Sequence, residues 1–239
     1  LSRTFLMAGV AMVTGAGRGL GAAISDKLLV DGWSLSIGLR EQSQAKRFDA
    51  GSDRLHVSHF DALDPASAEQ WVHDTVNHFG KINALVNNAG VLRMVDFEKG
   101  SEDDLDYLWS VNVKAPFRLI QMALPYLKAT GAGRVINIAS TDAKRFRPGS
   151  SLGYSMTKHS LIAMTQAVRH AGWDDGVRAT AICPGAIDTD LIANLPGVTS
   201  KADRLRPETV AGIVAFILTL PNQASVPEFI ANTRLENLI

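Results

Sequence analysis

Short apolar segments alternate with segments of helical periodicity along almost the whole chain of 239 residues. This alternation is typical of a parallel sheet with helices on both faces, because parallel neighbours need a crossover connection. The apolar runs predict strands at 9–14, 34–39, 54–60, 83–88, 133–140, 177–183 and 225–231. The periodic segments predict helices at 19–30, 65–79, 101–129, 151–171 and 208–220, and a turn of helix within 41–50. We therefore expect one α/β domain over 1–239, built on a mostly parallel seven-stranded sheet.

The longest predicted helix, 101–129, carries its own start and break signals. Ser101 and Asp104 have the spacing of a capping box. Pro116 and Pro125 predict that the helix is kinked or divided into two pieces. The one long irregular stretch, 186–206, follows a predicted strand, and long loops in compact domains often bind ligands. It is the candidate substrate loop.

The first predicted strand runs directly into the turn Gly15-Ala-Gly-Arg-Gly-Leu-Gly21, and a helical pattern follows. Strand, glycine turn and helix form a unit that binds dinucleotide phosphates, because glycines let the backbone approach the pyrophosphate and the helix N-terminus presents free N–H groups. Glycines also make ordinary turns, so it is the position after the first strand that favours a Rossmann-type, doubly wound sheet. The candidate phosphate-binding residues are Gly15, Gly17, Arg18, Gly19, Leu20 and Gly21.

Tyr154 and Lys158 stand four residues apart in the predicted helix 151–171, and Ser140 ends the predicted strand 133–140. Positions i and i+4 share a helix face, so the lysine ammonium can lie beside the phenol and favour its ionised form. A phenol titrates at about 10, and a lower pKa would suit acid–base chemistry at neutral pH. The spacing alone is more often that of an exposed pair, so the catalytic interpretation depends on its context.

Composition narrows the classes of partner. The chain has 24 basic and 24 acidic side chains, which argues against nucleic acid or an anionic membrane as the main partner. Cys183 is the only cysteine, so packing is its expected role. His73 and His78 are expected on a helix surface rather than in a metal site, and no metal is predicted. The longest apolar run, 210–220, is too short for a bilayer and the start lacks a signal-peptide pattern, so we expect a cytoplasmic protein.

In chain order, these motifs resemble the short-chain dehydrogenase/reductase family over about residues 9–231. The glycine spacing indicates its small single-domain branch, because the epimerase-like branch would have glycine where Arg18 stands. Each motif is short, and it is the joint match that is specific. The matching pieces are Thr14-Gly15 with Gly19 and Gly21, Asp61, Asn87-Asn88-Ala89-Gly90, Asn112, Ser140, Tyr154 with Lys158, and Pro184-Gly185.

The resemblance implies a role for each of four residues. Tyr154 would be the general acid or base at the substrate oxygen, and Lys158 would lower its pKa and hold the nicotinamide ribose. Ser140 would donate a hydrogen bond to the same oxygen, and Asn112 would anchor a proton-relaying water. Taken singly, Ser140 could merely end a strand and Asn112 could merely cap a helix break. Both alternatives weaken when all four residues stand in the family's order.

The resemblance also implies a nicotinamide cofactor. An NAD enzyme normally places an acid at the end of the second strand, where this chain has Leu39 followed by Arg40. With Arg18, two guanidiniums and no carboxylate suit a 2'-phosphate, so we expect NADP(H); Glu41 keeps NAD open. The further cofactor-binding candidates are Asp61, Ala62, Asn88, Ala89, Gly90, Pro184, Gly185, Ile187 and Thr189, together with Tyr154 and Lys158.

The substrate is expected to be a small carbonyl or alcohol compound, and the family implies a homotetramer or homodimer joined through 101–129 and 151–171. Three cationic residues could steer an anionic substrate, or could be ordinary solvated charges: Lys144, Arg145 and Arg147. Apolar residues available for subunit contacts, or equally for the core, are Leu119, Ile120, Ala123, Leu161, Ile162 and Met164. The competing functional class is a dinucleotide-binding sensor or scaffold that has lost turnover.

Overall fold

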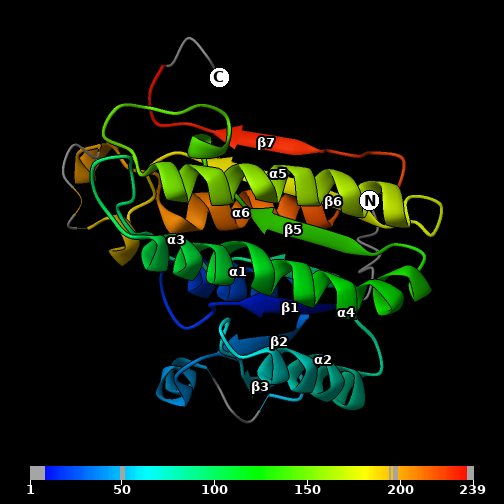
Figure 1. Ribbon diagram of the computed structural model, residues 1–239. Helices are drawn as coiled ribbons and strands as arrows, with labels where there is room; N and C mark the ends of the chain where they lie inside the picture. The colour runs from blue at the N-terminus through cyan, green and yellow to red at the C-terminus, as the bar shows by residue number, and fades with distance from the viewer. Residues whose placement is uncertain (1–8, 49–51, 194, 196–198, 236–239) are drawn as a thin grey trace.

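A computed structural model describes residues 9–48, 52–193, 195 and 199–235, and its centre is one seven-stranded sheet (Figure 1). The strands lie in the order β3-β2-β1-β4-β5-β6-β7, and every neighbouring pair is parallel. The strands are β1 (Val10–Thr14), β2 (Ser34–Leu39), β3 (Leu55–His59), β4 (Ala84–Asn87), β5 (Arg134–Ile138), β6 (Arg178–Pro184) and β7 (Glu228–Ala231). This is the doubly wound, Rossmann-type order, with the chain reversing direction across the sheet beside β1.

Helices cover both faces of the sheet (Figure 1). They are α1 (Gly19–Val30), α2 (Pro65–Phe79), α3 (Glu102–Trp109), α4 (Ala115–Ala129), α5 (Leu152–Gly172) and α6 (Pro207–Leu218). Alternate residues of β1 point to opposite faces: Val13 packs in the core with α1 and α6, whereas Met12 packs in the core with α2, α4 and α5. Both cores are thus built from near-continuous apolar strands, as expected for a buried parallel sheet. The predicted fold class is confirmed.

The expected long helix is divided at a segment that neither proline occupies. Residues Ser110–Lys114 form a π-helical turn between α3 and α4. Pro116 stands in the first turn of α4, directly after the π-helical turn, and Pro125 lies inside α4 without ending it. The predicted start is confirmed, because the Ser101 side chain accepts a hydrogen bond from the backbone N–H of Asp104.

The fifth strand is shorter than predicted. It ends at Ile138, so Ser140 does not end a strand but caps a 3₁₀ turn, Thr141–Ala143. The Ser140 hydroxyl oxygen accepts a hydrogen bond from the backbone N–H of Asp142 at 3.0 Å. Serine side chains can hydrogen-bond nearby backbone groups in this way, and here the bond helps to turn the chain away from the sheet just after β5.

The predicted substrate loop 186–206 contains some regular structure. A parallel bridge joins Ile187 to Leu205, and short 3₁₀ turns form at Asp190–Ile192 and Lys201–Asp203. Residues 194 and 196–198 of this loop, and 49–50 of the link 41–50, lie outside the described part of the chain. The predicted turn of helix in that link is present as Gln42–Arg47.

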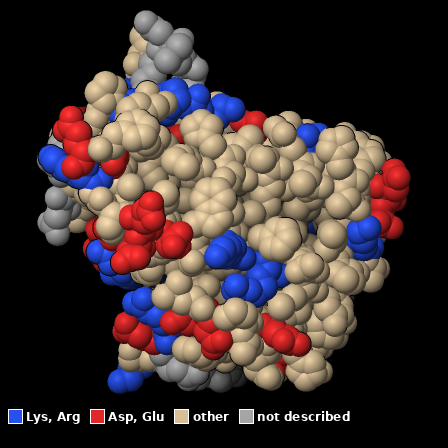
Figure 2. Space-filling view, viewed as in Figure 1, with Lys and Arg blue, Asp and Glu red and all other residues tan. Residues whose placement is uncertain are grey.

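The apolar residues proposed for subunit contacts mostly belong to the core. Leu119, Ile120, Ala123 and Leu161 are buried within this one chain. The large apolar side chains that α4 and α5 do expose are Phe117, Tyr126 and Met156. Figure 2 shows a broad uncharged area on this face, interrupted near its centre by a group of Lys and Arg side chains. Within the described residues, no helix has the length and apolar character needed to cross a membrane.

Candidate active site

A cavity of about 540 Å³ opens at the carboxyl ends of the strands, a size usual for small-molecule sites. It is lined by the turns that follow β1, β2, β4, β5 and β6, which belong to distant parts of the sequence. Open α/β sheets bind ligands at this edge, next to the strand where the winding reverses. All but two of the predicted site residues line the cavity; the exceptions are Gly17 and Asn112.

The glycine turn forms a close backbone cradle. Gly15 and Gly19 have φ values of +65° and +55°, in the left-handed region that favours glycine. A Cβ on Gly21 would stand 2.2 Å from the carbonyl oxygen of Gly15. Arg18, the residue before α1, makes no side-chain cap hydrogen bond, so the first N–H groups of α1 are available to an anion. Gly17 instead packs against Gln44, outside the cavity.

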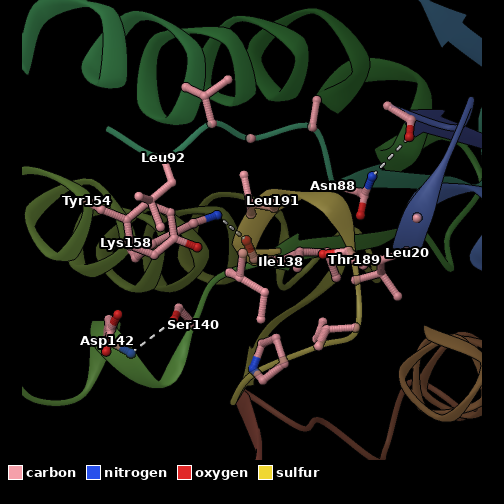
Figure 3. A pocket seen from close by; sticks show the side chains of 18 of the residues that line it. Leu20, Asn88, Leu92, Ile138, Ser140, Asp142, Tyr154, Lys158, Thr189 and Leu191 are labelled. Carbon is pink, nitrogen blue, oxygen red and sulfur yellow. Dashed lines mark hydrogen bonds between the residues drawn. The ribbon is translucent and has the colours of Figure 1, made fainter. Parts of the chain in front are cut away.

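Thr14 ties the glycine turn to the chain after β4. Its hydroxyl oxygen accepts hydrogen bonds from the backbone N–H groups of Asn88 and Ala89, each at 2.9 Å. The Asn88 side chain donates in return to the carbonyl oxygen of Thr14 at 2.9 Å (Figure 3). The wall formed by 88–90 is therefore held at a fixed distance from the turn.

Tyr154 and Lys158 are both buried on α5, with 8% and 4% of their surface exposed. The lysine Nζ lies 5.4 Å from the centroid of the tyrosine ring and donates a hydrogen bond of 2.8 Å to the carbonyl oxygen of Ile138 (Figure 3). Ser151 starts the helix, because its hydroxyl oxygen accepts from the backbone N–H of Tyr154. The cap of α5 and the end of β5 thus fix both side chains against the cavity.

The electrostatics of the pair differ from the sequence-based expectation. Burial lowers the pKa of Lys158 to about 8. Burial, and next the charge of Asp142, raise the pKa of Tyr154, while interaction with the Ser140 hydroxyl lowers it to a smaller extent. Lys158 was expected to lower this phenol's pKa, but the net direction is upward, because losing contact with water disfavours a buried phenolate.

Asn112 lies in the π-helical turn, behind the cavity wall. Its side-chain oxygen accepts from the backbone N–H of Val91, and its amide donates to the carbonyl oxygen of Val91, both at 2.9 Å. The same amide donates to the Thr157 hydroxyl at 3.1 Å. Asn112 therefore joins the chain after β4 to α5. These contacts position two separate segments, so Asn112 does more than cap a break in its own helix.

The entrance near β2 carries the two arginines expected to distinguish cofactors. Arg40 is exposed, 3.6 Å from the carboxylate of Glu41, and Arg18 is exposed, 3.1 Å from that of Asp190. Leu39 lines the same wall and is 1% exposed. The end of β2 thus contributes no acidic side chain of its own.

Of the three cations between Ser140 and Tyr154, two line the cavity. Lys144 points elsewhere and pairs with Glu228 of β7. Arg145 lies 2.7 Å from Asp142, and Arg147 lies 3.7 Å from the same carboxylate oxygen. Among the described residues no group of His, Cys, Asp and Glu could hold a metal ion. His73 and His78 lie on a helix surface and Cys183 is buried, as the sequence predicted.

Several lining residues were not predicted from the sequence. They include Gln44, Phe60, Leu63, Leu92, Tyr107 and Asn232. Position after a strand end could have indicated Phe60, Leu92 and Asn232, since all three follow strands. Gln44 and Tyr107 come from a short turn and a helix, where nothing in the local pattern indicates a cavity.

Comparison with known proteins gives one consistent picture. The family model described as short chain dehydrogenase matches residues 9–197. An agropine synthesis reductase of Rhizobium rhizogenes is 39% identical over 224 residues, 91% of this chain and 51% of that protein. The chain thus spans about half the length of the two reductases of that name that it matches.

Two solved structures illustrate the likeness of the fold. An alcohol dehydrogenase from the archaeon Thermococcus sibiricus, complexed with 5-hydroxy-NADP, has a TM-score of 0.86 at 29% identity, covering 95% of this chain and 99% of that one. A 3-ketoacyl-(acyl-carrier-protein) reductase from Brucella melitensis, complexed with NADH, has a TM-score of 0.85 at 25% identity, covering 94% and 97%. The likeness extends over nearly all the elements that surround the cavity.

Proposed function

The chain belongs to the short chain dehydrogenase family, and on that premise we propose that it transfers a hydride between a nicotinamide dinucleotide and a small carbonyl or alcohol substrate. The observation that carries this proposal is the meeting of Ser140, Tyr154 and Lys158 with the glycine turn in one cavity. An acid–base group, a hydrogen-bond donor and a phosphate cradle are the parts that carbonyl reduction requires. A sensor or scaffold that bound only the dinucleotide would not require a buried Tyr154 beside a buried Lys158.

The cofactor would lie along the carboxyl edge of the sheet. The pyrophosphate would rest on the glycine turn and the first turn of α1, and the ribose and adenine would follow 88–90 and Asp61. Ile187 and Thr189, both in the cavity wall, would hold the carboxamide. The nicotinamide supplies or accepts the hydride when bound. Relatives complexed with an NADP derivative and with NADH support a cofactor of this class.

Tyr154 would act as the proton donor to the substrate oxygen. Its raised pKa keeps the phenol protonated at neutral pH, which suits the reductive direction. The Ser140 hydroxyl already accepts from Asp142, so its own hydrogen can be donated to the same substrate oxygen. Lys158, with a pKa of about 8, remains mostly an ammonium at neutral pH and can donate to ribose hydroxyls.

We propose that NADP(H) is preferred over NAD(H). Arg18 and Arg40 line the cavity beside β2, and the buried Leu39 stands where an acid would otherwise bind the ribose. Guanidinium groups form strong hydrogen bonds with phosphate. Glu41 lies 3.6 Å from Arg40, and its carboxylate could favour NAD instead.

The direct test is the substitution Tyr154→Phe, assayed with NADPH and a panel of small aldehydes and ketones. We expect kcat to fall by roughly two to four orders of magnitude. The dissociation constant for NADPH should stay within about twofold, because the ring remains. Tyr126→Phe is the matched control, since Tyr126 lies on α4 outside the cavity. Full turnover by Tyr154→Phe would exclude the proposed role, and tight NADPH binding without turnover by the parent would favour a sensor.

We also propose a homodimer or homotetramer that uses the exposed face of α4 and α5. Phe117, Tyr126 and Met156 are large apolar side chains exposed on these helices. Large apolar and aromatic side chains at a surface are typical of subunit contacts. Light scattering on the parent and on Phe117→Lys should give a multimer and a smaller species, and a monomeric parent would exclude the proposal.

A further inference from the structure

The cavity is more basic than the protein around it. The chain has a net charge of zero. Among the described lining residues, however, six are Lys or Arg and three are Asp. Arg18 and Arg40 belong to the proposed cofactor site, and Lys158 to the proposed chemistry. The remaining cationic residues of the wall are Arg145, Arg147 and Arg234.

Of these three arginines, Arg147 is the one whose guanidinium has hydrogen-bond donors left to offer a ligand. In the described part of the chain its guanidinium makes no hydrogen bond, and its Nε is buried without a partner. The nearest carboxylate oxygen, on Asp142, is 3.7 Å away and is engaged at 2.7 Å by Arg145. A buried donor without a partner is costly. A ligand oxygen in the cavity would give the guanidinium the hydrogen bonds that Asp142 does not supply.

Arg147 follows a different strand from the arginine that suits the cofactor's 2'-phosphate. The turn after β5 holds its partner Asp142, whereas Arg40 follows β2. These two strands are three strand spacings apart in the sheet, which is roughly 14 Å. The Arg147 segment is therefore separated along the sheet from Arg40, which suits a 2'-phosphate.

The same segment connects Arg147 to the proposed acid. The carbonyl oxygen of Arg147 accepts from the backbone N–H of Ser150, and Ser151 then caps α5 by accepting from the N–H of Tyr154. Asp142, which lies between the two arginines, also raises the pKa of Tyr154 by its charge. Arg147 and Tyr154 thus both line the cavity, and Asp142 interacts with each of them.

We infer that Arg147 binds an anionic group of the substrate, so that the enzyme acts on carbonyl compounds that also carry a carboxylate or a phosphate. This inference rests on the proposed function. Asp142 orients the guanidinium without saturating it, and the substrate's anion completes its hydrogen bonds. Guanidinium pairs with either anion in a two-pronged geometry, which also orients the carbonyl toward Tyr154.

Binding of simple anions tests the site without any reaction. Benzoate and phenyl phosphate would be titrated calorimetrically into the parent protein saturated with NADP⁺. We expect one anion to bind with a salt-sensitive dissociation constant, and Arg147→Gln to weaken it tenfold or more. Lys144→Gln is the matched control, because Lys144 is on the same segment but outside the cavity. The anion with the lower dissociation constant, benzoate or phenyl phosphate, identifies carboxylate or phosphate as the group recognised.

Turnover gives the second measurement. The substrates are para-carboxybenzaldehyde and its methyl ester, methyl para-formylbenzoate, which differ in the charge of one group. If the site recognises carboxylate, the parent should have the higher kcat/KM on the acid, and Arg147→Gln should lower that value tenfold or more through KM. Its kcat/KM on the ester should fall much less than on the acid, because the ester carries no anion for Arg147 to bind. Arg147→Lys should restore part of the preference for the acid over the ester. Lysine keeps the positive charge but cannot form the two parallel hydrogen bonds of a guanidinium.

The possible failures are distinct. If the ester is reduced and Arg147→Gln changes neither anion binding nor the preference between substrates, the anion site is wrong and the proposed function stands. If an anion binds in an Arg147-dependent way but neither aldehyde is reduced, the site stands and the proposed reaction is what fails for these compounds. Equal weakening by Lys144→Gln would show a general charge effect and would also overturn the inference.

Discussion

The ammonium of Lys158 lies 5.4 Å from the ring centroid of Tyr154 and is hydrogen-bonded to the carbonyl oxygen of Ile138. A cation with 4% exposure and one backbone partner retains little of the solvation that water would give it. Burial accordingly lowers its pKa to about 8. The site therefore holds a charge at a cost in folding free energy, which can be measured through its pH dependence.

We expect Lys158→Met to be more stable than the parent at pH 7. The lysine pKa falls from 10.5 unfolded to about 8 folded, so the penalty is fully present below pH 8 and is relieved as the pH rises toward 10.5. The variant's advantage in unfolding free energy should shrink by about 2 kcal/mol between pH 7 and pH 9.5. Urea unfolding at the two pH values measures it. Lys46→Met, at an exposed position, should show no such trend.

Arg40→Ala should weaken NADPH binding selectively. Losing a charge-assisted hydrogen bond to the 2'-phosphate should raise the NADPH dissociation constant tenfold or more, with NADH changed less than threefold. Fluorescence titration, using transfer from the four tryptophans to the nicotinamide, gives both constants. Lys46→Ala is the control on the neighbouring turn, outside the cavity. Equal weakening for NADH and NADPH would contradict the assignment.

Combining Leu39→Asp with Arg40→Ala should reverse the cofactor preference. The new carboxylate at the end of β2 could accept hydrogen bonds from ribose hydroxyls and would repel a 2'-phosphate. Because Leu39 is 1% exposed, the midpoint of thermal unfolding should be recorded beside the two dissociation constants. A folded double variant that still prefers NADPH would exclude this explanation of specificity.

Gly21→Ala should abolish cofactor binding and lower stability. Its Cβ would meet the Gly15 carbonyl oxygen at 2.2 Å, so the turn must move. Overpacking of this kind costs about 1–3 kcal/mol. Gly212→Ala in α6 is the matched control, because its Cβ would have no neighbour within 4 Å, and it should be neutral or stabilising by about 0.5–1 kcal/mol. Thermal unfolding and NADPH titration on both variants distinguish a local clash from a general effect of methyl groups.

Asn112→Leu should destabilise the wall behind the cavity. It removes both hydrogen bonds to the backbone of Val91 and the bond to Thr157. Leaving buried groups unpaired should cost about 1–3 kcal/mol in urea unfolding. NADPH affinity should also fall, because Val91 adjoins the cofactor segment. Asn77→Leu, on the exposed face of α2, should leave the unfolding free energy and the NADPH affinity nearly unchanged. If Asn77→Leu lowered them as much, the effect would not be due to the hydrogen bonds of Asn112.

The sequence predicted the framework well because its signals are local. Helices Gly19–Val30 and Pro65–Phe79 and strand Ser34–Leu39 have the bounds that periodicity and breakers indicated. The division of the long helix was expected from its prolines, and it occurs at Ser110–Lys114, the turn that a proline at 116 disrupts. The contact of Asn112 in this turn with Val91, 21 positions away, could not be read from the local pattern.

The sequence predicted which residues line the site better than it predicted their burial and the charges around them. Strand-end residues converge because parallel strands end at one edge, so residues as distant as Gly15 and Thr189 could be assigned to one cavity. The direction of the Tyr154 pKa depends on burial and on Asp142, which spacing does not reveal. Likewise, Lys144 and Arg147 looked equivalent, and only the partners Glu228 and Asp142 separate them.

The pairing of β1 with β4, a strand much later in the sequence, also limits the order in which the sheet can form during synthesis. Ala11 pairs with Ala84, so β1 lacks its second neighbour until more than 70 further residues have left the ribosome. Until then one edge of the nascent sheet is open, and the phosphate cradle has no opposite wall. Non-local parallel pairing of this kind forms slowly. The emerging chain therefore carries an unpaired strand edge until β4 has been made.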